Sequence, residues 1–258
     1  MTTLTRKATT APLTDLSVSD KFKSEEVDSH YGYFSGYKPK PIAGQIAHLR
    51  QLLPKLGSAD EKLAEEDLPP DAEGWFAIPR WKRISPIYPE AVKIVLDLIK
   101  ETRNGNFYIH REAEIFMEYL RPHERTVAAL KRFGKEQKEH DILVIPAQSG
   151  LRHRGRSVRR AREVMNVSEF GLGAFHEFGL GAFHVAIMIL THPERLEHYR
   201  DLWIDCAGDE YAPGSGRCFS TPCFKSNGNG DGGAGFGSDW FDLPNDHYGS
   251  ASGFVLRP

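Results

Sequence analysis

Arginine is concentrated in one short stretch of the chain, between positions 152 and 162. Six arginines and one histidine fall within these eleven residues, and the next acid after Asp141 is Glu163. Guanidinium groups bind phosphate through paired hydrogen bonds and keep their charge when they are partly buried. The stretch therefore predicts an anion-binding site, and the residues that we expect to form it are Arg152, His153, Arg154, Arg156, Ser157, Arg159 and Arg160.

The predicted secondary structure gives these arginines a specific position. The β-branched, apolar run 142–146 predicts a buried strand, and Ser157 stands where the N-cap of a helix over 158–165 is expected. Arg159 and Arg160 would then lie in the first turn, where the helix dipole disfavours cations. Cations at such a place, beside free backbone N–H groups, indicate that an anion is held there.

A second basic stretch follows a predicted strand over 74–79. In the segment 79–83, with sequence PRWKR, a stackable ring stands among bases, as it does in proteins that bind single-stranded nucleic acid. The alternative is a core tryptophan beside a surface turn. We expect a secondary contact with the ligand from Trp81, Lys82 and Arg83.

Three carboxylates lie at and just after the end of another predicted strand, over 201–206. Asp205, Asp209 and Glu210 could hold Mg²⁺ through oxygen ligands, or act as acid and base in an enzyme. Ligands often bind at this end of the strands in α/β proteins. The alternative is an acidic loop that pairs with the arginines of the chain itself.

The three cysteines, at positions 206, 218 and 223, are too few for a disulfide framework. Their spacing matches no zinc motif, and we expect no other metal site. A reducing compartment follows from this cysteine usage. No apolar run approaches the roughly 18 residues that span a bilayer, so the sequence predicts a soluble cytoplasmic protein without membrane contact.

The net charge of −2 argues against a protein that binds polyanions with its whole surface. The positive charge is instead local, because residues 141–168 carry six arginines against two acids, a net charge of +4. Acids are concentrated in 60–73 and in 205–258. The arginines could therefore pair with acidic stretches inside one fold.

The remaining pattern predicts an α+β fold, with one mixed β-sheet packed by helices in a single domain over 31–258. Residues 1–30 have the composition of a disordered arm, and 225–238 form a Gly-rich segment that predicts a flexible loop. Further helices are expected over 42–56, 88–102, 112–120 and 122–138, and further strands over 107–109 and 247–256.

A tandem duplication interrupts this organisation. The eight residues EFGLGAFH occur at 169–176 and again at 177–184. The second copy runs into an apolar stretch, so we expect it to enter a buried helix, and the first copy could form either a bulge or a helical turn. Whether the duplication is natural or engineered stays open.

Several segments resemble stretches of uncharacterised bacterial proteins. They are GWFAIPRW, DILVIPAQSGLRHRGRSVRRARE, THPERL, DLWIDCAGDEYAP and GSASGF. The resemblance implies a bacterial protein of the cytosol and brings no activity, cofactor or site.

The sequence thus favours a protein that binds phosphate-bearing ligands or nucleic acid through its arginines. One alternative is a metal-dependent enzyme that processes phosphoesters or nucleotides, with Mg²⁺ on Asp205, Asp209 and Glu210. Another is a structural or interaction protein whose arginines are paired internally. The oligomeric state stays open.

Overall fold

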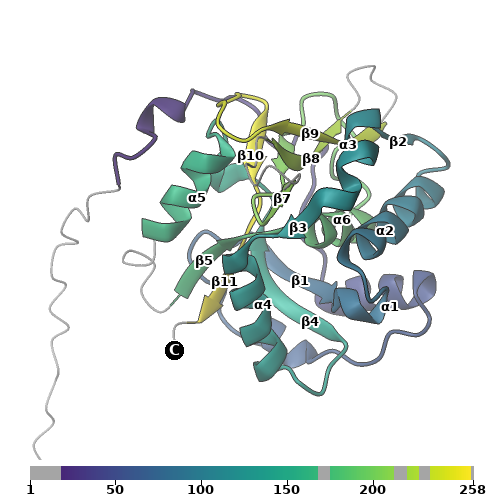
Figure 1. Ribbon diagram of the computed structural model, residues 1–258. Coiled ribbons are helices and arrows are strands. Elements are labelled where there is room, and N and C mark those ends of the chain that lie inside the picture. The colour runs from purple at the N-terminus through teal and green to yellow at the C-terminus, as the bar shows by residue number, and fades with distance from the viewer. Residues whose placement is uncertain (1–18, 168–174, 212–219, 227–232, 257–258) are drawn as a thin grey trace, which may run out of the picture.

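A computed structural model describes residues 19–167, 175–211, 220–226 and 233–256. The chain has an α+β fold, as the sequence predicted, and its strands form two larger sheets where the sequence had indicated one mixed sheet (Figure 1). Predicted features that fall on 1–18, most of the first repeat copy (169–174), 212–219 with Cys218, and 227–232 lie outside the described residues. Among the described residues, no helix combines the length and apolar character that a membrane span requires.

The first sheet is antiparallel and has the order β1-β4-β11-β5. The strands are β1 (Gly74–Pro79), β4 (Ile142–Gln148), β11 (Ser252–Leu256) and β5 (Phe175–Gly179). Strand β4 is buried along its whole length, as its apolar composition predicted, and extends two residues past the expected end at Pro146.

The second sheet is mixed and has the order β10-β6-β8-β9-β2. Its strands are β10 (Tyr248–Ser250), β6 (Trp203–Asp205), β8 (Ser220–Ser226), β9 (Ala234–Trp240) and β2 (Phe107–Ile109). Strands β10 and β6 are parallel, as are β9 and β2, and the other pairs are antiparallel. The predicted flexible loop over 225–238 is thus wrong at its ends, since these residues pair in β8 and β9.

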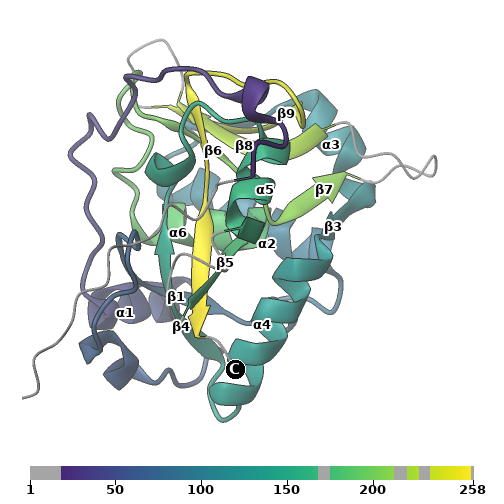
Figure 2. The same cartoon turned by 90° about the vertical axis from the view of Figure 1, so that its left-hand side faces the viewer.

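Helix α6 (Ala182–Thr191) occupies the centre of the fold, and all ten of its residues are buried. It packs against α2 (Tyr88–Thr102), β1 and α1 (Ile42–Leu52), and these elements share one hydrophobic core with both sheets (Figures 1 and 2). The second copy of the repeat therefore begins in β5 and reaches the buried helix only at its last three residues.

The segment between α2 and β4 departs most from prediction. Helix α3 (Arg111–Phe116) is short, and a small strand, β3 (Leu120–Pro122), pairs with β7 (Asp209–Tyr211) before α4 (Glu124–Glu136) begins. Pro122 was predicted in the first turn of a helix, but it closes β3 instead. The N-cap of α4 is His123, whose ring accepts a hydrogen bond from the Arg125 amide.

Residues 19–30 of the N-terminal arm are described by the structure and contact the rest of the fold, whereas the sequence predicted disorder to residue 30. A short 3₁₀ helix, η1 (Lys23–Glu25), is followed by a β-bridge between Glu26 and Arg156. Figure 2 shows this purple segment beside helix α5 (Val158–Val167). Composition alone missed this contact because the arm is held by charge pairs with residues more than 130 positions away.

The close approach of β5 to the loop before β7 supplies a test of the fold. A Cβ on Gly179 would lie 2.6 Å from the carbonyl carbon of Ala207 and 2.7 Å from the amide of Gly208. Backbone atoms cannot move away cheaply, so Gly179→Ala should lower the free energy of unfolding by about 1–3 kcal/mol. Urea denaturation followed by circular dichroism measures this loss.

Gly44→Ala is the matched control, because a Cβ at that position of α1 would meet nothing within 4 Å. It should leave stability unchanged or raise it by up to about 1 kcal/mol. Equal losses in both variants would contradict the packing described for β5.

Candidate functional site

The arginine-rich stretch forms the strand, loop and helix that the sequence predicted. Strand β4 ends at Gln148, a single 3₁₀ turn, η5, spans Leu151–His153, and α5 begins at Val158. The Ser157 hydroxyl accepts a hydrogen bond of 3.0 Å from the Arg160 amide, which confirms it as the N-cap. Gly150, with φ of 121°, adopts a conformation that other residues rarely reach.

Arg152 and His153 turn inward, toward a buried carboxylate that sequence reasoning passed over. Glu177 accepts a hydrogen bond of 3.0 Å from Arg152 Nε, and its other oxygen lies 2.8 Å from His153 Nε2. The Ser252 hydroxyl donates to the same oxygen at 2.5 Å, and Gln148 Nε2 donates to Ser252 at 2.8 Å. The carboxylate thus joins β5, β11 and the end of β4.

The electrostatics of this cluster favour an ionised Glu177. Burial alone would raise the pKa of its carboxyl group, but the charge of His153 and hydrogen bonds from its neighbours lower the pKa to about 2. The carboxylate therefore stays charged across the physiological range and balances the charge of Arg152. Arg152 also pairs with Asp71 at the surface.

Three further arginines bind the N-terminal arm. Arg159 Nε lies 3.2 Å from the Glu25 carboxylate, and Ser157 Oγ donates to it at 2.6 Å. Glu26 accepts from Arg160 Nε and lies 3.5 Å from Arg156 Nε. The anion that the first turn of α5 was predicted to hold is therefore supplied by the chain itself.

The two remaining arginines of the stretch differ in exposure. Arg162 donates to the backbone carbonyls of Ala207 and Asp209 at 2.8 and 2.7 Å. Arg154 is exposed and makes a 3.3 Å hydrogen bond to the carbonyl of Tyr31. The six arginines thus contact four different sets of partners, and they do not all line one cavity.

The three candidate catalytic carboxylates also lie in different environments, and each has its own set of contacts. Asp205 lies on β6 and is buried, and its Oδ1 has no hydrogen-bond partner among the described residues. Asp209 accepts from the Ala182 amide and from the Tyr88 hydroxyl, both at 2.7 Å, and so caps α6. Glu210 pairs with Arg121 at 2.8 Å and lies 3.8 Å from Arg162.

The positions of these carboxylates do not support a Mg²⁺ site. Within the described ranges, no group of three or more His, Cys, Asp or Glu side chains is arranged to hold a metal ion. Burial raises the pKa of Asp205 well above its ordinary value, and it raises that of Asp209 to about 7. Both groups therefore tend toward the neutral form, which binds cations poorly.

The second basic stretch borders a groove. Arg80 is fixed at the C-terminal end of α4, where its guanidinium donates to the carbonyls of His140, Gly134 and Gln137 at 2.8–3.1 Å. This anchor holds the short 3₁₀ helix η3 (Trp81–Arg83) against α4. Arg83 pairs with Asp141 at 2.7 Å, and Lys82 lies 5.3 Å from the centre of the Trp81 ring.

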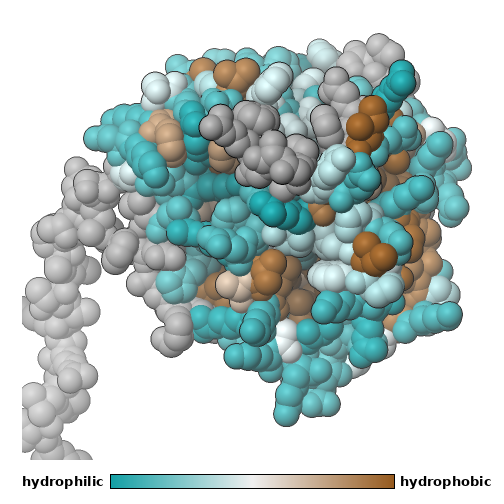
Figure 3. All heavy atoms as spheres, viewed as in Figure 1, coloured by the Kyte–Doolittle hydropathy of each residue, from teal (hydrophilic) through white to brown (hydrophobic). Residues whose placement is uncertain are grey.

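The groove between η3 and α4 has a cavity volume of about 590 Å³. Its floor is formed by Ile78, Leu143 and the buried His184, and its walls by Trp81 and the face of α4 that carries positions 127, 130, 131, 134 and 135. Figure 3 shows apolar surface between hydrophilic stretches where Figure 1 places α4 and β4. Burial lowers the pKa of His184 to about 4, so its ring is neutral at pH 7.

Exposed lysines surround this apolar groove. Lys82, Lys131 and Lys135 line it, and none of them has a salt bridge to a described residue. Sequence reasoning found Trp81 and Lys82 but missed Lys131 and Lys135. The available signal was their spacing of four residues, which places both on one face of a helix. This signal did not reveal the groove, because its opposite wall comes from a segment about 50 positions earlier.

Comparison with known proteins gave no relative. No family model, curated protein or solved structure matches the chain. The resemblance to uncharacterised bacterial proteins stays a prediction.

The Glu177 cluster predicts a large and pH-dependent contribution to stability. Glu177→Gln would leave Arg152 and His153 without their buried carboxylate and should lower the free energy of unfolding by about 3–5 kcal/mol at pH 7. Because the folded pKa is depressed to about 2, this contribution is present above the unfolded value of 4.5 and is lost as pH falls toward 2. Denaturation from pH 2.5 to 7 measures it.

Arg154→Ala provides the control for this variant, since Arg154 is exposed and should change stability by less than about 0.5 kcal/mol. A Glu177→Gln loss that is small at pH 7, or one that does not shrink in acid, would rule out the buried ion pair.

Asp209 predicts the opposite dependence on pH. Its folded pKa is raised to about 7, so its contribution to stability is present below the unfolded value of 3.8 and is lost as pH rises through 7. Asp209→Asn removes this titration and can still accept hydrogen bonds from Tyr88 and Ala182. The stability of the wild type relative to the variant should therefore fall between pH 4 and pH 7. A constant difference over this range would contradict the assignment.

Proposed function

We propose that the protein binds a phosphate-bearing ligand in the groove between η3 and α4. The ligand has a flat, ring-shaped body next to its phosphate, as a nucleotide or an unpaired base of single-stranded nucleic acid has. The groove carries this proposal, because it combines apolar walls, the ring of Trp81 and three lysines without salt bridges to described residues.

The dimensions of the groove support a ligand of this kind. Small-molecule sites commonly occupy about 300–1,000 Å³ and are mostly apolar, with a few polar groups that fix orientation. A base would stack against the ring of Trp81, which packs on Tyr88 in a T-shaped contact with ring centres 5.6 Å apart. The ammonium groups of Lys131 and Lys135 at the groove edge would meet the phosphate.

The charges of the arginine stretch favour the groove as the primary site. Arg152 and Arg160 are paired with carboxylates and are mostly buried, so binding there would first require the loss of existing ion pairs. The lysines of the groove are exposed and require no such loss. The alternative of a metal-dependent enzyme has less support, because Asp205, Asp209 and Glu210 do not converge.

Removal of the two α4 lysines tests this proposal. Lys131→Ala combined with Lys135→Ala should weaken binding of AMP at least about tenfold, because two charge-assisted contacts with phosphate are lost. Binding to a short single-stranded oligonucleotide should weaken as well, with the slope of log affinity against log salt reduced by about 1.4. Quenching of tryptophan fluorescence reports the occupied groove.

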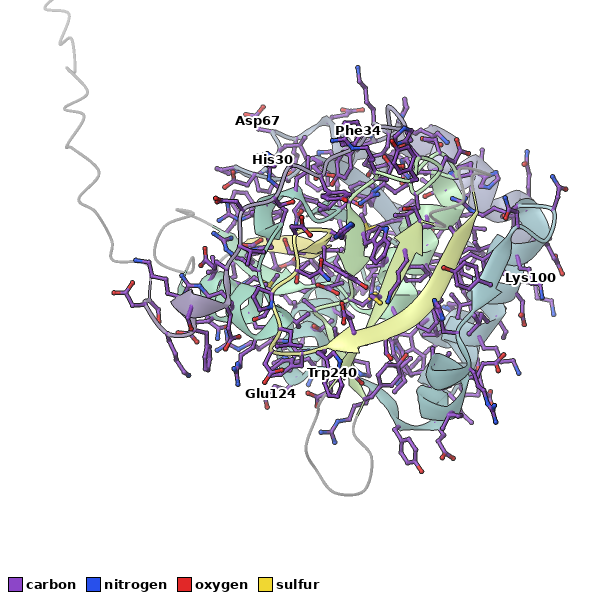
Figure 4. All side chains as sticks on the ribbon, turned by 90° about the horizontal axis from the view of Figure 1, so that it is seen from above. His30, Phe34, Asp67, Lys100, Glu124 and Trp240 are labelled. Carbon is purple, nitrogen blue, oxygen red and sulfur yellow. The ribbon has the colours of Figure 1, made fainter. Side chains whose placement is uncertain are left out.

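The control changes the net charge equally at another place. Lys93 and Lys100 are exposed on α2 and do not line the groove, and Lys100 points away from the body of the molecule in Figure 4. Their double replacement by Ala should leave AMP binding unchanged. Inorganic phosphate should bind more weakly than AMP, since it lacks the stacking ring. The proposal fails if neither AMP nor the oligonucleotide binds, or if both double variants lose affinity equally.

A further inference from the structure

The segment 19–27 of the N-terminal arm lies on the arginine surface of α5, which we define as Arg156, Arg159, Arg160 and the Ser157 cap. Two adjacent acids of the arm, Glu25 and Glu26, supply the negative charge at this surface. Arg159 binds Glu25 through two of its nitrogens, Nε and Nη2, and the cap hydroxyl donates to the same carboxylate. This is the geometry in which guanidinium groups also bind phosphate.

Few apolar contacts hold the arm in place. No residue of η1 is buried, and the side chain of Val27 is 42% exposed. The backbone contributes only a few hydrogen bonds, including those from the Val27 amide to Gly155 and from the Ser157 amide to Glu25, at 2.8 and 3.1 Å. The attachment of the arm therefore depends mainly on ion pairs between its carboxylates and the arginines, in which another anion could replace the carboxylates.

The arm also carries backbone strain that detachment would relieve. Phe22 adopts a left-handed conformation with φ of 62°, which is unfavourable for a residue with a side chain. Its ring lies 4.3 Å from the guanidinium carbon of Arg159, so the contact with the arginine surface offsets part of this cost. Figure 4 shows η1 at the edge of the molecule, and no residue of η1 belongs to either sheet.

The ionisation of the two acids agrees with this arrangement. Burial raises the pKa of each, but the hydrogen bonds and charges of Arg159 and Ser157 for Glu25, and of Arg160 and Arg156 for Glu26, lower both below the ordinary value. Both carboxylates therefore stay charged at neutral pH. The arginine surface is thus matched to a ligand with two adjacent negative groups.

We propose that the arginine surface of α5 is a second anion-binding site, specific for neighbouring phosphate groups, with Glu25 and Glu26 as its exchangeable internal occupants. A diphosphate, or two successive phosphates of a nucleic-acid strand, displaces the arm and takes over its contacts with Arg159, Arg160 and the Ser157 cap. The arm thereby reduces the affinity of the protein for such ligands. This site is independent of the groove between η3 and α4.

Inorganic pyrophosphate is the probe, because it carries two phosphates and no ring. Glu25→Gln combined with Glu26→Gln should bind pyrophosphate at least about tenfold more tightly than the wild type in calorimetric titration, since competition from the arm is weakened. Arg159→Ala and Arg160→Ala on that background should abolish the gain. Glu61→Gln combined with Glu65→Gln, on the exposed 3₁₀ helix Glu61–Glu65, changes the net charge equally and should bind like the wild type.

Hydrogen exchange of the wild type provides a second measurement that needs no variant. Pyrophosphate should speed exchange of the Val27 amide, whereas sodium chloride at the same ionic strength should do so less. The proposal is overturned if the Glu25/Glu26 variant binds no more tightly than the wild type, or if the Glu61/Glu65 variant gains equally. It is also overturned if pyrophosphate does not change the hydrogen-exchange rate of the Val27 amide. The groove proposal is unaffected by these outcomes, because its test uses AMP and the α4 lysines.

Discussion

Every buried arginine needs a carboxylate or a carbonyl oxygen in contact with its guanidinium group, and this requirement organises one side of the molecule. A buried, unpaired charge costs several kcal/mol, which is comparable to the stability of a whole domain. Glu177 meets this need for Arg152, and Glu25 and Glu26 meet it for the first turn of α5. The pairing connects the arm, the end of β4 and strand β5, which are far apart in the sequence.

The same requirement divides the positive charge of the protein into two groups. The arginines are mostly committed to internal partners, whereas the lysines around the groove are exposed and need none. An anion bound at the proposed groove site would leave these ion pairs intact. At the proposed α5 site an internal carboxylate would have to leave first, so the two proposed sites would respond differently to ligand concentration and salt.

The sequence correctly predicted those elements whose position is determined by neighbouring residues. Strand β4 follows from its β-branched residues, and the start of α5 follows from the capping residue Ser157. It missed Glu177, which lies at the junction of the tandem repeat and gains its role from partners 24, 25 and 75 residues away in the sequence. Pro122 was misplaced in a helix because pairing between β3 and β7, 89 positions apart at Arg121 and Glu210, is invisible to local propensity. The groove was found only on its Trp81 side, since its other wall comes from α4.

The location of a bound nucleotide tests the central claim most directly. An azido-adenine nucleotide, activated by light on the full chain, marks the peptides that line its site, and mass spectrometry identifies them. The structure predicts labelling within 78–82 and within 127–135, reduced by an excess of AMP. Labelling confined to 151–162, or spread over the surface without protection by AMP, would contradict the assignment of the ligand to the groove.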